Sequence, residues 1–474
     1  MEFDKKYLDL FGIKESDLRE VLSIALARGG DYADLYFEYT VSNELSLRDG
    51  EVNAVSSNID YGVGIRVVSG EKTGFAFTEQ TTLAEMKNAA RIAAQIATLP
   101  DSVTNIPAAF TPIKGANYSP IISPWEDHSV TEKMGWLTSL NEKVFAKDSR
   151  ITKVLERLTD SNTKILFYNS LGESFTDERP MAALVVTCVM EENGRIESSS
   201  SSRSFRMGYE FLNEALLDEM AQEAYDKGVI LFQASQPKGG EMPVVMGAGG
   251  SGILLHEAIG HAFEADFNRK GTSIFSDKLG KQICDKSINI VDDGTLMHNR
   301  GSVNIDDEGI PGQKTYMVKD GILNSYLHDR ISAKFYNTAS TGNGRRESFR
   351  FMPIPRMRAT YMENGNCREA DLIAEVKKGI YVDNFSNGQV QIGAGDFTFY
   401  VKSGYLIENG KLTTPIKDIN IIGNGPEALA DIIGVADNNR IDNGTWTCGK
   451  EQYCPVSCGM PSILIKQLTV GGVN

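Results

Sequence analysis

Four segments in the first half of the chain place apolar residues at helical spacing. Residues 16–28 do so behind a Ser-Asp pair and end at Gly-Gly, and residues 82–97, 130–147 and 212–228 repeat the pattern. Between these helices lie strand-like stretches with turn signals such as RDG, NSLG and ENG. The order helix, strands, helix occurs twice, which predicts an internal duplication.

The pattern changes at SQPKGGE, residues 235–241, which combines Pro and Gly with no apolar residue. We therefore predict two domains, residues 1–235 and 241–474. The second contains short apolar segments separated by Asp-Gly, Glu-Gly and Asn-Gly dipeptides, which favour hairpins, and one further helix at 368–379. The expected fold class is α+β, with a duplicated α/β N-terminal domain and a mostly antiparallel β C-terminal domain that carries the active-site helix.

Composition narrows the classes of function. The 474 residues carry a formal charge of −15, which disfavours direct binding to nucleic acid. The longest apolar run, MAALVVTCVM, is too short to cross a bilayer, and the N-terminal segment lacks the apolar core of a signal peptide. We expect a cytoplasmic protein with no membrane partner. The six cysteines are scattered, so a disulfide framework is not expected.

The sequence HEAIGH, residues 256–261, contains two of the five histidines in the chain. In a regular α-helix, residues five apart point about 140° apart, so His256 and His261 would not converge on one metal ion. One extra residue accommodated as a π-bulge restores convergence, and Gly260 lowers the cost of such a distortion. We therefore predict a zinc site on a locally unwound helix, with Glu257 as the base that activates water. A surface cluster of these side chains is the structural alternative.

The spacing of residues alone does not identify the third zinc ligand. Glu264 lies on the same distorted helix, and Cys448, Cys454 and Cys458 offer sulfur unless they are inert buried thiols. His128, His298 and His328 are solitary, and we interpret them as structural. The upstream GAGGSG also fits a dinucleotide-binding loop, but the hairpins that follow supply no βαβ unit, so we interpret its glycines as a tight turn into the helix.

The sequence resembles the TldD/PmbA family, and most closely its TldD branch. Members of this family were once called modulators of DNA gyrase and are now viewed as metalloproteases. The shared stretches include LLHEAIGHAFEADFNRKGTSIF, RGSVNIDDEGIPGQ, TGNGRRES, DNGTWTCGKE and the final GGVN. They cover nearly all of the second half, whereas the first half matches only in its organisation. The resemblance implies a peptide tunnel at a dimer interface, formed by a homodimer or with an inactive TldE/PmbA-type homologue.

The resemblance also implies residue roles. His256, His261 and Cys448 would hold zinc, Glu257 would be the base, and this chain would be the active subunit. After CGKE the sequence departs from the family and runs QYCPVSCG, which leaves Cys454 and Cys458 as competing ligands and suggests redox sensitivity. Arg345 and Arg346, in TGNGRRES, are expected near the chamber as substrate-binding residues, with a structural ion pair as the alternative.

The expected function is zinc-dependent cleavage of unfolded polypeptides or peptides, limited by access to a closed chamber and not by sequence. Pairing of the substrate backbone with an exposed strand edge would explain this tolerance. The alternative is a noncatalytic partner or modulator that uses the same fold for binding. The intact His-Glu-His set and the acidic charge count against that alternative.

Overall fold

The computed structural model describes residues 2–97, 106–107 and 109–472, so the last two residues of the GGVN motif lie outside the described part. The N-terminal half forms one sheet in the order β3-β2-β1-β5-β6, and both β4 and β7 pair with β6. Its strands are β1 Tyr32–Arg48, β2 Glu51–Ser69, β3 Lys72–Thr78, β4 Thr111–Pro112, β5 Ile151–Asn169, β6 Glu173–Glu192 and β7 Arg195–Phe205.

The predicted duplication is visible in the order of elements. Three strands lie between α2 (Glu15–Leu26) and α3 (Leu83–Ala93), and three more lie between α4 (Val130–Phe145) and α5 (Glu214–Gln233). The two sets of strands meet where β1 pairs with β5. Asp49-Gly50 and Asn193-Gly194 make the hairpin turns with positive φ that the sequence predicts.

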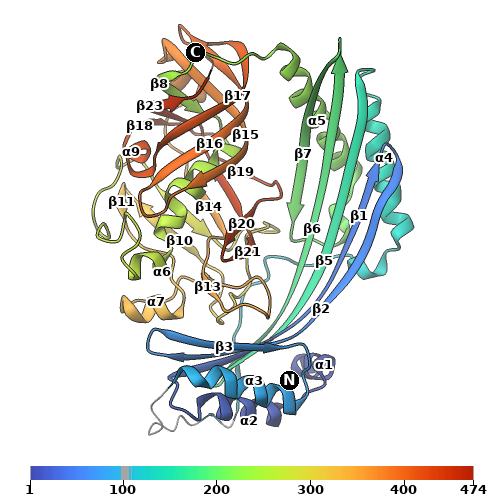
Figure 1. The fold of residues 1–474 in the computed structure, drawn as a ribbon, viewed down its shortest axis with the longest axis vertical. Helices are drawn as coiled ribbons and strands as arrows, with labels where there is room; N and C mark the ends of the chain where they lie inside the picture. Colours follow the sequence, from blue (N-terminus) through green and yellow to red (C-terminus); the bar gives the residue numbers. More distant parts are fainter. Residues whose placement is uncertain (1, 98–105, 108, 473–474) are drawn as a thin grey trace.

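Helices gather at both ends of this sheet (Figure 1). One hydrophobic core joins α1–α3 to β1 and β2, and another joins α4 and α5 to β5 and β6. Helix α1 (Glu2–Phe11) was not predicted, although Tyr7 and Phe11 supply a buried face four residues apart. None of the described helices is long and apolar enough to span a bilayer.

Two six-stranded sheets form most of the C-terminal half. In the first, ordered β17-β16-β15-β8-β23-β18, an extra pairing of β17 with β23 closes five strands into a ring. In the second the order is β11-β10-β9-β14-β22-β19. The strands of the first sheet are β8 Gly240–Met246, β15 Lys378–Val390, β16 Asp396–Glu408, β17 Lys411–Asn424, β18 Ile432–Val435 and β23 Ile463–Val470. Those of the second are β9 Ile290–Asp293, β10 Lys314–Lys319, β11 Ile322–Leu323, β14 Ala359–Met362, β19 Arg440–Asp442 and β22 Ser457–Met460.

Smaller elements complete this half. Two short hairpins pair β12 with β13 and β20 with β21. Their bounds are Gly344–Arg345, Ile354–Pro355, Thr447–Lys450 and Gln452–Pro455, and the short helices are α6 Ala265–Arg269, α7 Arg330–Phe335, α8 Glu369–Ala374 and α9 Gly425–Ala430. Single 3₁₀ turns span 94–96, 125–127, 209–211, 250–252 and 261–263, and a π-helical turn spans Leu255–Gly260.

The antiparallel prediction for this half holds for most pairs but not for all. Strand β8 pairs in parallel with β15, and β14 pairs in parallel with β22. Each pair joins segments more than 90 residues apart, which local turn signals cannot reveal. The helix predicted at 368–379 ends at Ala374, because the residues from Lys378 onward form β15 and pair within the sheet.

The two halves are joined by buried ion pairs. Arg66 on β2 binds Asp34 on β1 and also Glu308 from the second half, and all three side chains are fully buried. Arg179 on β6 binds Asp307 at 2.6 Å in the same interface. Separating the halves would take these arginine partners away from Glu308 and Asp307, so the pairs favour the position of the long sheet beside the C-terminal half.

Candidate metal centre

The chain leaves β8 through a tight turn and enters the π-helical turn. Gly249 has φ of 90°, which only glycine adopts readily, and this supports the tight-turn interpretation of GAGGSG. The π-helical turn and the 3₁₀ turn after it pack into the main C-terminal core, where Leu255, Ile259 and Phe263 are buried against both six-stranded sheets. The histidines are therefore carried on a segment that tertiary packing holds in place.

The predicted distortion of the helix is present. The backbone N–H of His261 donates to the carbonyl of His256, an i→i+5 bond that replaces the usual i→i+4 bond. The two imidazole rings lie with centroids 4.9 Å apart and nearly perpendicular. Histidines five residues apart therefore face the same region.

The reason for glycine at position 260 differs from the one predicted. Gly260 has ordinary helical angles, φ −59° and ψ −49°, so it relieves no backbone strain. A Cβ there would lie 2.3 Å from Sδ of Met357 and 2.9 Å from the carbonyl oxygen of Leu255, so a larger residue would force a neighbour to shift. The glycine accommodates this close packing.

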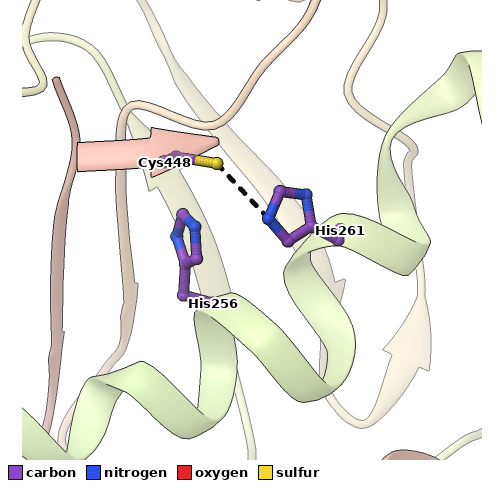
Figure 2. A group of neighbouring side chains, drawn as sticks. All are labelled: His256, His261 and Cys448. Atoms are coloured by element: carbon purple, nitrogen blue, oxygen red, sulfur yellow. Dashed lines mark hydrogen bonds between the residues drawn. The ribbon is translucent and has the colours of Figure 1, made fainter. Parts of the chain in front are cut away.

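Cys448 joins the two histidines from a distant part of the chain (Figure 2). Its Sγ lies 3.3 Å from Nε2 of His261, and one ligand atom from each of the three residues lies within 4.8 Å of the others. All three are buried, and Nδ1 of His256 has no hydrogen-bond partner in the part of the chain that the structure describes. Two imidazole nitrogens and one sulfur are a donor set that suits zinc, so these residues fit the ion.

The electrostatics of the group favour the ligand form of the thiol. Burial raises the pKa of Cys448, but His256 and His261 outweigh burial and lower this pKa to about 4. The thiolate is the form that binds metals. Glu257 follows His256, is only partly buried, and lines a cavity of about 190 Å³ together with His256, Ser386, Trp446 and Cys458.

Glu264 has a different place from the ligands. Its Oε2 lies 2.9 Å from Nδ1 of His261 and 3.1 Å from Nζ of Lys450, and the side chain is fully buried. Burial raises the pKa of Glu264, but Lys450 and His261 outweigh burial and lower it to about 2. The carboxylate therefore orients His261 from the side opposite Cys448, as carboxylates often orient metal-binding histidines.

Lys450 and Arg356 were not predicted from the sequence, although Lys450 lies in the CGKE stretch. Lys450 is on the same strand as Cys448 and binds Asp266 at 2.8 Å as well as Glu264. Arg356, fully buried, donates to the carbonyls of Cys448 and Gln452 at 2.7 and 2.8 Å. Lys450 therefore attaches the β20–β21 hairpin to the segment that follows the histidines, and Arg356 attaches the hairpin to the segment after β13.

The two arginines of TGNGRRES are buried and bonded within the protein. Arg345 donates to the carbonyl of Pro455 at 2.8 Å, and Arg346 donates to that of Asp307 at 3.1 Å and lies 3.5 Å from Asp34. Neither lines the cavity beside His256. These contacts match the structural alternative, in which Arg346 forms an ion pair, better than a role in substrate binding.

The other histidines lie elsewhere. His128 stacks on Tyr209 with ring centroids 3.5 Å apart, and Nδ1 of His298 lies 3.2 Å from the carbonyl of Arg206. His328 is buried, which lowers its pKa to about 4. Within the described residues none of them belongs to the metal group.

Comparison with known proteins identifies the family. Residues 239–472 match the PmbA/TldA metallopeptidase C-terminal domain, residues 33–97 match domain 1, and residues 123–232 match the central domain. The chain belongs to the PmbA/TldD metallopeptidase family. It is 40% identical to a metalloprotease TldD homolog of Haemophilus influenzae over 96% of both chains, which places it in the TldD branch.

A more distant curated relative and a solved structure are also similar to the chain. A zinc metalloprotease TldD homolog of Saccharolobus solfataricus is 28% identical, over 94% of this chain and 97% of that protein. The crystal structure of TldE from Thermococcus kodakarensis superimposes with a TM-score of 0.74 at 18% identity, covering 96% of this chain and all of that one. At this identity the second likeness concerns the fold alone.

Removing the sulfur should abolish metal binding, whereas removing the charge of Glu264 should only weaken it. We expect Cys448→Ala to lose bound zinc, because two imidazoles on one turn leave the opposite side of the ion open. Glu264→Gln should retain zinc with roughly 10- to 100-fold lower affinity, the usual loss when a residue that orients a ligand is changed. Titration with zinc against a competing chelator measures both.

Cys284→Ala is the matched control, because Cys284 is also buried but lies outside the metal group. Full zinc binding by Cys448→Ala together with its release from Glu264→Gln would make Glu264 the third ligand.

Proposed function

We propose that this chain is a zinc-dependent peptidase that cleaves unfolded polypeptides or peptides in an enclosed cleft. The observation that carries the proposal is the buried group of His256, His261 and Cys448 beside a cavity that Glu257 also lines. Curated relatives over almost the whole chain are named metalloproteases. Binding by a noncatalytic modulator does not require three buried metal-ligand side chains next to a cavity, which counts against the alternative of a noncatalytic partner.

Each residue of the centre has a separate role in the proposed hydrolysis. His256, His261 and Cys448 would hold zinc, which would supply the Lewis acidity for activating water and polarising a peptide carbonyl. The Glu257 carboxylate accepts a proton from the attacking water and delivers it to the leaving amine nitrogen. Glu264 keeps His261 in the tautomer and orientation that leave Nε2 free for the metal.

Space for a peptide exists next to the cavity. A cleft of about 600 Å³ separates β7 and α5 from the C-terminal half, and it shares Ser386 and Trp446 with the cavity that contains His256 and Glu257. Its lining includes Ser198, Ser200 and Ser202 on one side and Tyr400 and Lys402 on the other. A chain lying in the cleft would reach the candidate centre at Trp446.

The β7 side of the cleft is an open strand edge. The amides of Ser204 and Arg206 point away from β6, because they donate to the carbonyls of Asn443 and His298. By the alternation of a regular antiparallel strand, the amides of Ser198, Ser200 and Ser202 point the same way. Among the described residues no strand pairs with this edge between 198 and 202. We infer that the substrate backbone pairs there, which requires no particular side chains.

The proposed assembly rests on the family resemblance. We infer that two chains enclose the cleft, the partner being a second copy or a TldE/PmbA-type homologue without the histidines. Access through such a closed space would admit only unfolded chains. The cytoplasmic location stays a prediction, and so does the absence of direct nucleic-acid binding.

Replacing the proposed base should separate metal binding from catalysis. We expect Glu257→Gln to keep its zinc and to lose roughly 10²- to 10⁴-fold in kcat, the usual contribution of a general base. Hydrolysis of an unfolded casein-type chain and zinc content are measured together. Glu375→Gln, at an exposed position after α8, is the control. Unchanged hydrolysis by Glu257→Gln would remove Glu257 from the mechanism.

A proline substitution on β7 tests whether the substrate backbone pairs with this strand edge. Proline at position 200 removes one outward amide but leaves pairing with β6 intact, as edge strands tolerate. We expect Ser200→Pro to lower kcat/KM for unfolded peptides roughly two- to twelvefold, because one hydrogen bond contributes about 0.5–1.5 kcal/mol. Ser200→Ala, which keeps the amide, is the control. Equal kinetics for the two variants, with unchanged stability and zinc content, would contradict backbone pairing at β7.

A further inference from the structure

The sulfur of the metal group has a second cysteine directly across its hairpin. Strands β20 and β21 pair antiparallel, and Cys448 is the register partner of Cys454. Directly opposite residues point to the same face of a hairpin, with Cα atoms about 4.5–5.5 Å apart. Disulfides span Cα distances of about 4.4–6.8 Å, so this register position is one that a disulfide can bridge.

Cys454 has no role in the metal group. It is a free thiol, 1% exposed, and it is not among the three residues whose ligand atoms cluster. Its Sγ lies 3.4 Å from Nη1 of Arg356, the same guanidinium that holds the carbonyl of Cys448. The arginine therefore holds both cysteines on a single rigid hairpin.

We propose that Cys448 and Cys454 form a reversible disulfide on exposure to hydrogen peroxide, and that this disulfide competes with zinc for the Cys448 sulfur. The hairpin then has two exclusive states, with Cys448 either on the metal or bonded to Cys454. The disulfide itself needs only the hairpin, whereas its effect on activity rests on the proposed function.

The chemistry balances with peroxide as the oxidant. The Cys448 thiolate attacks one oxygen of hydrogen peroxide, the O–O bond breaks, and the departing hydroxide takes a proton to become water. The thiol of Cys454 then attacks the sulfur of the resulting sulfenic acid, an S–S bond forms, the S–O bond breaks, and a second water leaves. Two thiols lose two electrons, which reduce one peroxide to two waters.

The cavity of about 190 Å³ beside the metal group reaches the base of this hairpin. It is lined by Thr447, which precedes Cys448, and by Val456, which follows Cys454 by two residues. Hydrogen peroxide is little larger than water and fits such a space. Cys458 lines the same cavity, but its register partners are Thr360 and Asp442, so it has no cysteine opposite it.

Peptide mapping tests the disulfide directly. Full-length zinc-free protein is treated with hydrogen peroxide, free thiols are blocked, and the digest is analysed by mass spectrometry. We expect one linked pair of peptides containing Cys448 and Cys454, which dithiothreitol separates. Zinc binding should fall in proportion to the linked fraction and return on reduction. Zinc-loaded protein should form the link more slowly than zinc-free protein.

Two variants serve as controls. Cys454→Ser keeps an acceptor for Arg356, should bind zinc when reduced, and should form no link. Peroxide then oxidises its Cys448 to the sulfenic acid, which dithiothreitol reduces, and with longer exposure to the sulfinic acid, which dithiothreitol does not reduce. Cys284→Ser, at a buried thiol outside the metal group and the cavity, should behave like the unchanged protein. Thiols at 448 and 454 that are consumed by peroxide without a link between them, or a link to Cys458, would overturn the proposal. A failure of reduced protein to bind zinc would contradict the proposed function instead, because the linked peptide is detected without metal.

Discussion

The hydrogen bond from the amide of His261 to the carbonyl of His256 is the constraint on which the candidate centre depends. In a regular helix the two imidazoles would point about 140° apart and could not share an ion. The i→i+5 bond brings them together, and the close contact of Gly260 with Met357 accompanies it. Because the turn is buried between the C-terminal sheets, packing supplies the stability that a π-helical turn lacks in isolation.

The rest of the centre is arranged around that turn. Two histidines on one turn leave the far side of a metal ion open, and a hairpin almost 190 residues away fills it with Cys448. Lys450 binds Glu264, which in turn bonds His261, so one buried chain of charges joins the hairpin to the turn. Burying such charges is costly unless each has a partner, and here each does. The same hairpin carries Cys454, which places a competing reaction next to the ligand.

The sequence predicts what depends on local chemistry. The helices α2 to α5 and the Asp-Gly and Asn-Gly hairpin turns follow from spacing and turn residues, and the π-helical turn follows from the need of His256 and His261 to converge. The closure of β17 onto β23 and the parallel pairs could not be predicted, because they join segments distant in the chain. The same limit applies to the Lys450–Glu264 pair and to the burial of Arg345 and Arg346 in the protein interior. Cys448 was identified by resemblance to the family, because spacing alone left Glu264 and the other cysteines open.

The central claim is that one sulfur and two imidazoles hold a single zinc ion. X-ray absorption spectroscopy of the zinc-loaded, reduced protein tests this most directly, because sulfur and nitrogen scatter at different distances. We expect one sulfur at about 2.3 Å and nitrogen neighbours at about 2.0–2.1 Å, with the multiple-scattering signature of imidazole. A first shell of nitrogen and oxygen without sulfur would contradict it.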